Sequence, residues 1–284
     1  MKDTRFDYHG EISWCPGCGD YKILEALKLA LEELDVDPLK LAVVSGIGQA
    51  AKMPHYLRCN CVNGLHGRGL PLATGVKAAN RGLTVIAVGG DGDMYGEGGN
   101  HFVHAIRRNP DITNVVCNNM IYGLTKGQGS PTTPLGMKTS SQPEGVTNYP
   151  LNPLLLAISC GATFVARGSA ADVPRTKELL KAAIRHKGYA LVDIFQPCVS
   201  FNKVNTWQWL GGATKWLEEA DHDPSDMNAA MALTMRSEPY PLGIIYRGES
   251  RPTFEETRAA YQGGDDTPLF QRSRRLEVVA KLLG

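Results

Sequence analysis

Asp91 and Asn119 are the residues whose types and spacing point most directly to chemistry. Asp91 stands in the run Gly90-Asp91-Gly92-Asp93 after an apolar segment, and Asn119 follows a second apolar segment further along the chain. Oxygen ligands at the carboxyl ends of two strands, beside glycines that permit close backbone approach, suit a Mg²⁺ ion that holds a diphosphate. A plain turn would explain the glycines alone. The strand before Asp91 and the spaced asparagine favour the metal and diphosphate site.

A second candidate centre is the run Trp14–Gly19, which carries Cys15 and Cys18 as a C-x-x-C pair. A zinc ribbon would need a second such pair, which the sequence lacks. A redox dithiol would normally follow a strand inside a βαβ unit. The third alternative, a [4Fe–4S] cluster completed by distant cysteines, agrees best with the pattern, because glycines around the thiolates let backbone amides approach the sulfurs.

The remaining cysteines divide into candidate ligands and core residues. Cys198 follows an apolar strand-like run, which would place it at the carboxyl edge of a sheet. Cys59 and Cys61 are the other candidates to complete a cluster. Cys117 and Cys160 lie in or beside apolar runs, so we expect both to be small buried hydrophobic residues.

Composition restricts the class of protein. The chain has 284 residues, a net charge of +1 and no lysine or arginine tract, so it is not expected to bind nucleic acid or an anionic membrane surface. No apolar stretch is long enough to span a bilayer, and the first thirty or so residues lack a signal-peptide pattern. We therefore expect a cytoplasmic protein, in which cysteines serve metal or redox chemistry and do not form disulfides.

The charge distribution adds a further clue. Between Asp37 and Asp91 there is no carboxylate, although this interval holds six basic residues: Lys40, Lys52, Arg58, Arg68, Lys77 and Arg81. A long stretch with bases and no acids favours an anionic ligand such as a diphosphate or a carboxylate substrate. Chance clustering in an apolar region is the alternative.

Apolar strand-like runs alternate with segments of helical period. The expected strands are residues 41–45, 84–89, 114–117, 163–167 and 190–195, and the expected helices are residues 20–34, 71–80, 98–108, 152–160 and 170–187. Near-continuous apolar strands that alternate with helices are typical of a parallel sheet covered on both faces. The fold class is therefore α/β, with ligands at the carboxyl ends of the strands.

Two segments depart from this alternation. Residues 123–149 are rich in Gly, Pro, Ser and Thr, and a loop of that length in a compact domain is usually functional or mobile. From residue 202 the pattern weakens. We expect one α/β domain over residues 1–201 and an irregular extension over residues 202–284 that packs on this domain or on a partner.

Several motifs, taken together, resemble the β subunit of the 2-oxoacid:ferredoxin oxidoreductases. They occur in the order of that family: WCPGCG at Trp14–Gly19, SGIG at Ser45–Gly48, LHGR at Leu65–Arg68, GGDGD at Gly89–Asp93, YGLTKGQ at Tyr122–Gln128 with SPT after it, QPC at Gln196–Cys198, and PLGIIYRGESRPTFEE at Pro241–Glu256. The GDG run followed by the asparagine pair is the thiamin-diphosphate motif. The resemblance implies a thiamin-diphosphate-binding fold.

The resemblance also implies an activity and a set of partners. This subunit would hold thiamin diphosphate, Mg²⁺ and one [4Fe–4S] cluster, and an α subunit would supply the glutamate that activates the thiamin, in an (αβ)₂ assembly. The reaction is the CoA-dependent oxidative decarboxylation of a 2-oxoacid to acyl-CoA and CO₂, with electrons passing to ferredoxin. The reverse reaction fixes CO₂, as in the reductive tricarboxylic acid cycle. Among substrates, 2-oxoglutarate is favoured over pyruvate and branched-chain 2-oxoacids.

Residue by residue, the resemblance assigns Asp91, Asn119 and the Ile121 carbonyl to the metal. Lys52 maps to a lysine near the substrate carboxylate, and Leu124 maps to a position that shapes the substrate pocket. The residues implied in cofactor binding are Gly46, Ile47, Gly48, His66, Gly90, Gly92, Asp93, Tyr122 and Gly123.

The sequence departs from the family at one cluster position. Many relatives carry a cysteine directly after GIG, where this chain has Gln49, and a neutral amide is a poor ligand for cluster iron. We therefore expect the cluster ligands to be Cys15, Cys18, Cys198 and Cys59, with Cys61 as the alternative fourth ligand.

Two other classes of protein agree less well with the sequence. The run Gly46–Ala51 resembles the turn of a nicotinamide dehydrogenase, but that fingerprint requires an acidic residue about 20 positions later, and the acid-free interval has none. A non-catalytic iron–sulfur electron-transfer protein is the other alternative. Such a carrier would have no use for Asp91 and Asn119 at metal-binding spacing.

Overall fold

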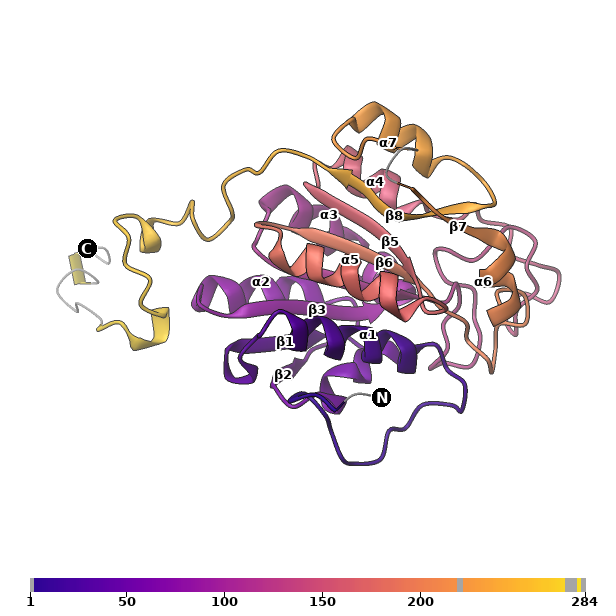
Figure 1. The fold of residues 1–284 in the computed structure, drawn as a ribbon, viewed down its shortest axis with the longest axis horizontal. Helices are drawn as coiled ribbons and strands as arrows, with labels where there is room; N and C mark the ends of the chain where they lie inside the picture. Colours follow the sequence, from indigo (N-terminus) through magenta and orange to yellow (C-terminus); the bar gives the residue numbers. More distant parts are fainter. Residues whose placement is uncertain (1–2, 219–221, 274–279, 282–284) are drawn as a thin grey trace.

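Eight strands form one sheet in the computed structural model, which describes residues 3–218, 222–273 and 280–281 (Figure 1). The strands are β1 (Leu41–Ser45), β2 (Asn60–Asn63), β3 (Thr84–Gly90), β4 (Thr113–Asn118), β5 (Phe164–Ser169), β6 (Ala190–Phe195), β7 (Thr214–Trp216) and β8 (Tyr240–Arg247). Their order across the sheet is β2-β1-β3-β4-β6-β5-β8-β7. The first six strands of this order are parallel, and β8 pairs antiparallel with β5. The mostly parallel α/β fold expected from the sequence is confirmed.

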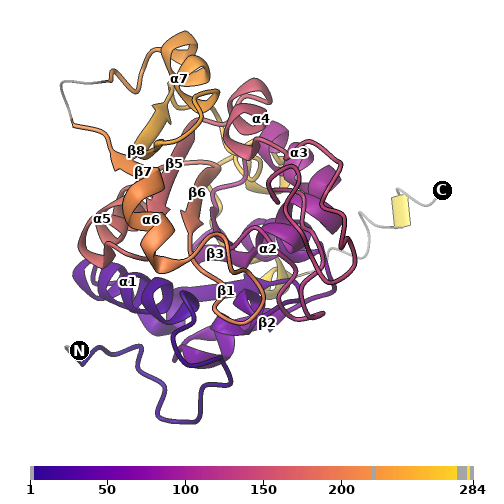
Figure 2. The same cartoon turned by 90° about the vertical axis from the view of Figure 1, so that its right-hand side faces the viewer.

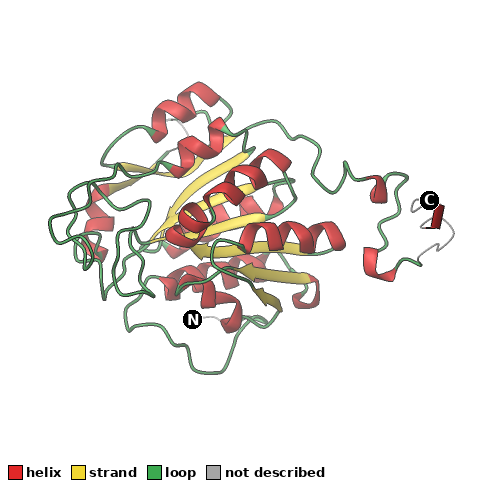
Figure 3. Ribbon diagram, turned by 180° about the vertical axis from the view of Figure 1, so that it is seen from behind, coloured by secondary structure: helices red, strands yellow, loops and turns green. Residues whose placement is uncertain are grey.

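Helices cover both faces of the sheet (Figures 2 and 3). They are α1 (Asp20–Glu33), α2 (Gly69–Ala79), α3 (Gly99–Arg108), α4 (Pro153–Ser159), α5 (Val173–Arg185), α6 (Trp207–Ala213) and α7 (Met227–Thr234). Helices α4, α5, α6 and α7 begin at side-chain caps, and α4 and α5 also carry a proline in the first turn. The side chain of Asn152 accepts a hydrogen bond from the Leu155 amide before α4, and that of Asp172 does the same for Arg175 before α5. A proline follows each of these two caps within the first turn, where its missing N–H costs nothing.

The core consists of two apolar layers, one on each face of the sheet. Alternate residues of β1 point to opposite faces: Leu41 and Val43 pack with α1 and α5, whereas Ala42 and Val44 pack with α2, α3 and α4. All five β1 residues are buried, which explains why its sequence is apolar throughout and does not alternate with polar residues. The sheet is therefore rigidly held, and its carboxyl edge provides a fixed platform for the loops.

The expected elements agree with the structure to within a few residues. Strands β1 and β6 have the expected bounds, and α2 begins slightly before Pro71, so that Pro71 lies in its first turn. Strand β2 was not expected. All four of its residues are exposed, so its sequence lacks the apolar run that marks a buried strand.

The segment after residue 201 contains more regular structure than we expected. Helices α6 and α7 and strands β7 and β8 lie in it, and β8 extends the sheet beside β5. Beyond β8 the chain runs away from the sheet without further strands among the described residues (Figure 1). Residues 274–279 and 282–284 of the expected extension lie outside the described residues. No helix in the described ranges is long and apolar enough to cross a membrane.

Candidate active site

The predicted metal ligands lie together because β3 and β4 are neighbours. Gly90 of β3 pairs with Cys117 of β4, so the residues that follow each strand leave the sheet at the same level. Asp91 follows Gly90 directly, and Asn119 lies just beyond β4. The carboxyl edge of the sheet thus holds both residues, as expected for ligand sites in parallel sheets.

Asp91 is a fully buried acidic group at this edge. Its side chain is 1% exposed, and Oδ2 accepts hydrogen bonds from Ser130 Oγ at 2.5 Å and Thr132 Oγ1 at 2.6 Å. Burial raises the pKa of the Asp91 carboxyl to about 6, and the two hydroxyls oppose that shift. A carboxylate that is withdrawn from water in this way is destabilised in its charged form, and a nearby cation would stabilise that form.

The donor set around Asp91 fits Mg²⁺. Both hydroxyls approach Oδ2, so no described side chain donates a hydrogen bond to Oδ1. The Asn119 side-chain oxygen accepts from the Ile121 amide at 3.0 Å, which folds the turn back, and the Ile121 carbonyl accepts no hydrogen bond from the described residues. Met120 between them adopts a left-handed conformation, φ 57°. Carboxylate, amide and carbonyl oxygens are the ligands that this hard cation prefers.

Asp93 organises the neighbouring glycine turn. Its Oδ1 accepts hydrogen bonds from the backbone amides of Ile47 at 3.1 Å and Gly67 at 2.7 Å, and it lies 2.7 Å from His66 Nδ1. A Cβ on Gly46 would stand 2.2 Å from Asp93 Oδ2, so only glycine fits there. The Asp93 carboxylate therefore links the Gly46–Gly48 turn to His66. The family resemblance implied that both bind the cofactor.

Tyr122 and the glycines around it close the other side of the turn. The Tyr122 ring lies where a side chain at Gly92 would be, because a Cβ there would stand 2.2 Å from Tyr122 Cε1. Its hydroxyl donates to Glu97 Oε2 at 3.0 Å, and its ring meets His66 edge-on at 6.3 Å between centroids. Leu124, the residue expected to shape a substrate pocket, is 42% exposed. An exposed leucine at this edge is available to a ligand or a partner.

Lys52 lies in a short 3₁₀ helix, Ala50–Tyr56, that follows the glycine turn after β1. Its side chain is half-buried, and its ammonium forms no ion pair with any residue in the described ranges. A cation without a protein partner near a ligand edge is suited to an anionic ligand.

Three of the four predicted cluster cysteines lie around one pocket. Cys15, Cys18 and Cys198 line it together with Gln49, Asn119 and Gly123. Ser200 Oγ donates to Cys15 Sγ at 3.1 Å, and a Cβ on Gly123 would lie 3.6 Å from Cys198 Sγ. Burial raises the pKa of the Cys18 thiol, so that thiol gains from a metal that stabilises its thiolate.

Cys59, the expected fourth ligand, is not among the residues that line this pocket. It directly precedes β2, whose first residue Asn60 pairs with Ala42 near the amino end of β1. The cysteine pocket lies past the carboxyl end of the sheet. Cys59 is therefore separated from it by the length of β1, in which each residue rises about 3.3 Å. Cys59 packs against the core, where burial raises its pKa to about 12. Cys61 pairs with Val43 on the exposed edge strand and is also absent from the pocket lining.

Gln49 lies beside the three cysteines, at the pocket where a fourth ligand was expected. Its side-chain Oε1 is buried and has no hydrogen-bond partner among the described residues, and the residue lines the cysteine pocket. Trp14 Nε1 donates to the Gln49 carbonyl at 2.8 Å, which fixes the backbone beside the C-x-x-C loop. Gln49 therefore lies at the cysteine pocket, whereas Cys59 and Cys61 are not among the residues that line it.

The hydroxyl donors of Asp91 were not identified from the sequence. Ser130 and Thr132 lie in the long loop at residues 123–149, almost forty positions from Asp91, and nothing local marks them as its partners. The only signal was the SPT run at Ser130–Thr132, which formed part of the family motif.

This fold and edge define a thiamin-diphosphate-binding α/β domain. Residues 42–194 match the family described as "Thiamine pyrophosphate enzyme, C-terminal TPP binding domain", and residues 198–263 match the C-terminal family of the pyruvate ferredoxin oxidoreductase beta subunit. The chain is 46% identical over 259 residues to the 2-oxoacid:ferredoxin oxidoreductase subunit beta of Saccharolobus solfataricus, covering 86% of this chain and 84% of that protein. It belongs to the family of 2-oxoacid:ferredoxin oxidoreductase β subunits, and is thus a subunit of an oxidoreductase.

Two further relatives are informative. The 2-oxoglutarate oxidoreductase subunit KorB of Mycobacterium tuberculosis is 45% identical over 202 residues, 71% of this chain and 54% of that protein. A solved structure, the 2-oxoglutarate:ferredoxin oxidoreductase from Magnetococcus marinus with 2-oxoglutarate, coenzyme A and succinyl-CoA bound, is similar with a TM-score of 0.90 and 37% identity. The match covers 99% of this chain and 97% of that one. The resemblance drawn from the motifs is confirmed.

Replacing Thr132 with valine should destabilise the fold. Thr132→Val removes the hydroxyl that donates to Asp91 Oδ2 at 2.6 Å and also lies 3.0 Å from Asn118 Oδ1, at a cost of about 1–3 kcal/mol in the free energy of unfolding. Urea denaturation without added cofactor measures this cost. Thr125→Val is the control, because the exposed Thr125 hydroxyl donates to the half-buried Gln128 side chain at the surface, and this variant should stay within about 0.5 kcal/mol of wild type. Equal stabilities of the two variants would contradict this account.

Proposed function

We propose that this chain is the β subunit of a CoA-dependent 2-oxoglutarate:ferredoxin oxidoreductase, which decarboxylates its substrate reversibly and passes electrons to ferredoxin. The observation that carries the proposal is the buried Asp91 carboxylate, whose Oδ1 accepts no hydrogen bond from a described side chain and which leaves the sheet at the same edge as Asn119. Mg²⁺ at this place would hold the diphosphate of thiamin diphosphate, which supplies the chemistry that stabilises negative charge at the decarboxylated carbon. Asp91, Asn119 and the Ile121 carbonyl are the proposed ligands.

Several other residues would bind the cofactor. Gly46–Gly48 and Gly90–Gly92 would let the backbone approach the diphosphate, and Asp93 would orient His66 and the amide of Ile47. Tyr122 and Gly123 would form the opposite wall. A non-catalytic electron-transfer protein would not need this arrangement.

We propose that a [4Fe–4S] cluster is bound by Cys15, Cys18 and Cys198. Its support is the common pocket of the three cysteines, which shares Asn119 and Gly123 with the cofactor turn. This adjacency would give electrons a short route from the cofactor to the cluster and on to ferredoxin. Soft thiolates are the ligands that iron–sulfur clusters select.

We further propose that an α subunit forms the rest of the active site and supplies the glutamate that activates the thiamin, in an (αβ)₂ assembly. The relatives are named β subunits, which implies such a partner. Around the carboxyl edge, large apolar side chains are exposed, among them Leu65 at 76% and Tyr149 at 85%. Exposed apolar groups gathered at one edge are typical of a protein interface.

The choice of 2-oxoglutarate is supported by the named activities of the relatives. Three similar proteins, from Mycobacterium tuberculosis, Methanocaldococcus jannaschii and Archaeoglobus fulgidus, are named for 2-oxoglutarate, and so is the structure from Magnetococcus marinus. Lys52 would face a substrate carboxylate, and Leu124 would contact the substrate side chain. Pyruvate and branched-chain 2-oxoacids are the competing substrates.

Asp91→Ala should abolish Mg²⁺-dependent binding of thiamin diphosphate, because a hard cation loses its charged ligand. Asn119→Ala should weaken binding in the same direction. Isothermal titration of the protein purified with its α subunit measures both. The control is Asp266→Ala, which removes a carboxylate that is 71% exposed and paired with Arg81 away from the site. Undiminished affinity in Asp91→Ala would remove the metal assignment.

Lys52→Met should raise the KM for 2-oxoglutarate on the order of ten- to hundredfold, because a charged contact to a carboxylate contributes about 1.5–3 kcal/mol. Affinity for thiamin diphosphate should not change. Steady-state reduction of ferredoxin with 2-oxoglutarate or pyruvate measures the effect, and the wild-type ratio of kcat/KM identifies the preferred substrate. Lys138→Met, which removes an exposed lysine in the loop at residues 123–149, is the control. An unchanged KM would make Lys52 a surface residue.

Gln49→Cys should convert a three-thiolate site into a four-thiolate site. In wild type a cluster held by the three cysteines would have one iron without a thiolate, so mild oxidation should release that iron and give a three-iron signal in electron paramagnetic resonance. The variant should keep four irons. Cys59→Ser is the control and should match wild type in iron content and spectrum. Loss of the cluster in Cys59→Ser would instead restore Cys59 as the ligand.

A further inference from the structure

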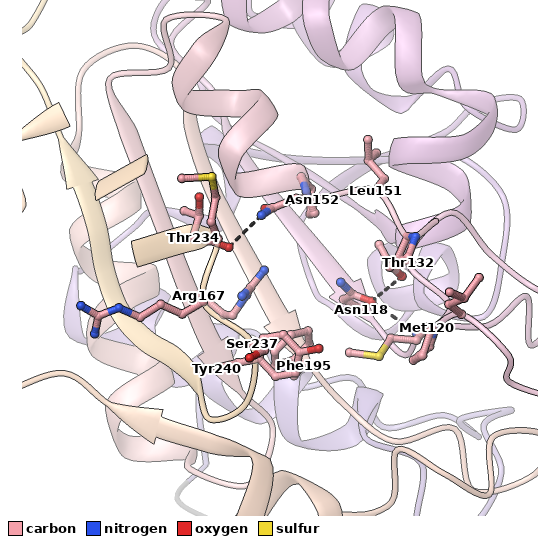
Figure 4. Close-up of a pocket in the computed structure, with 16 residues that line it drawn as sticks. Asn118, Met120, Thr132, Leu151, Asn152, Arg167, Phe195, Thr234, Ser237 and Tyr240 are labelled. Atoms are coloured by element: carbon pink, nitrogen blue, oxygen red, sulfur yellow. Dashed lines mark hydrogen bonds between the residues drawn. The ribbon is translucent and has the colours of Figure 1, made fainter. Parts of the chain in front are cut away.

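A second cavity lies beside the cofactor edge and is not used by the proposed reaction. Its volume is about 320 Å³, and it opens between the ends of β4, β5 and β6 and the loops at residues 132–135, 150–153 and 234–240. Figure 4 shows Arg167, Phe195 and Tyr240 on one side of it and Asn118, Met120 and Thr132 on the other. Its size is at the lower end of ligand pockets, about 300–1,000 Å³.

Arg167 is a buried cation that directs most of its donors into this cavity. The residue is 5% exposed, and its guanidinium lies over the Phe195 ring at 4.6 Å and near the Tyr240 ring at 5.8 Å. Neither Nη1 nor Nη2 donates a hydrogen bond to any residue that the structure describes, and Arg167 lines the cavity. Both Nη groups are therefore open to the cavity, where a ligand or water can accept their hydrogen bonds.

The ion pair with Asp193 does not account for the guanidinium. Only Nε of Arg167 approaches Asp193, at 3.4 Å, which is long for a charge-assisted hydrogen bond. Asp193 already accepts from the Tyr95 hydroxyl at 2.8 Å and from the Asn118 amide at 3.1 Å. The two Nη groups of Arg167 therefore remain available to a ligand. The Phe195 and Tyr240 rings pack against the guanidinium and restrict its movement.

The lining of the cavity has the charge of an anion site. Of the 16 residues that line it, Arg167 and Arg236 are basic, and none in the described part of the chain is Asp or Glu. Pro134, Leu151 and Pro153 provide apolar walls. The site thus pairs a fixed guanidinium fork with room for a small carbon skeleton.

We propose that this cavity binds a small organic anion whose carboxylate or phosphate group takes the two Nη atoms of Arg167. Arginine binds both groups in two-pronged fashion, which lysine cannot do. The apolar walls would contact the rest of the ligand, and Arg236 would attract it at the mouth. This site does not depend on the proposed reaction.

The test is isothermal titration of the protein purified with its α subunit, saturated with Mg²⁺ and thiamin diphosphate so that the diphosphate site is filled. The probes are benzoate and inorganic phosphate, which separate a carboxylate ligand from a phosphate ligand. At least one probe should bind wild type. Arg167→Lys, which keeps the charge and loses the fork, should weaken that binding at least tenfold.

A second variant guards against effects on folding. Ser237→Trp fills the exposed mouth without touching the Arg167–Asp193 pair and should also weaken the probe at least tenfold. Arg247→Met, which removes an arginine stacked on Phe164 outside the cavity, is the matched control and should bind like wild type. Failure of both probes to bind wild type, or equal affinities in wild type and both cavity variants, would overturn the proposal.

Discussion

The burial of one carboxylate, Asp91, sets the arrangement of the carboxyl edge. A charge that is withdrawn from water must be met by donors or a cation, and here Ser130 and Thr132 reach it from a loop distant in sequence. The Thr132 hydroxyl also lies within hydrogen-bond distance of Asn118 Oδ1, and the Asn118 side-chain amide donates to Asp193. Asp193 also accepts from the Tyr95 hydroxyl and forms an ion pair with Arg167. The loop, the asparagine turn and the centre of the sheet are thus joined by a continuous set of polar contacts.

What could be predicted from the sequence follows from how local each signal is. Strands β1 and β6 are fully buried and therefore apolar throughout, so their bounds can be identified from composition. Strand β2 is exposed and pairs on one side only, and nothing in its four residues indicates a strand. Strand β8 contains Pro241 and Gly243, which weaken its signal, and tertiary pairing with β5 decides its conformation.

The candidate site shows the same limit. Asp91, Asn119 and the C-x-x-C loop could be proposed because each lies in a short motif with a chemical reason, whereas His66 came from the family resemblance alone. Cys59 was expected as a ligand because it lies close to Gln49 along the chain, whereas it precedes β2 at the amino end of β1 and does not line the cysteine pocket. Gln49 could be placed only once the pocket around Cys15, Cys18 and Cys198 was known.

The antiparallel pairing of β8 with β5 has a consequence for biosynthesis. Strand β5 is complete at Ser169, but its outer neighbour is not made until Arg247. While the ribosome synthesises the intervening segment, an apolar strand of the nascent chain has an open side to which other chains can add. Cells that make this protein should therefore benefit from chaperone binding during that interval, and truncation before Tyr240 should leave an aggregation-prone product.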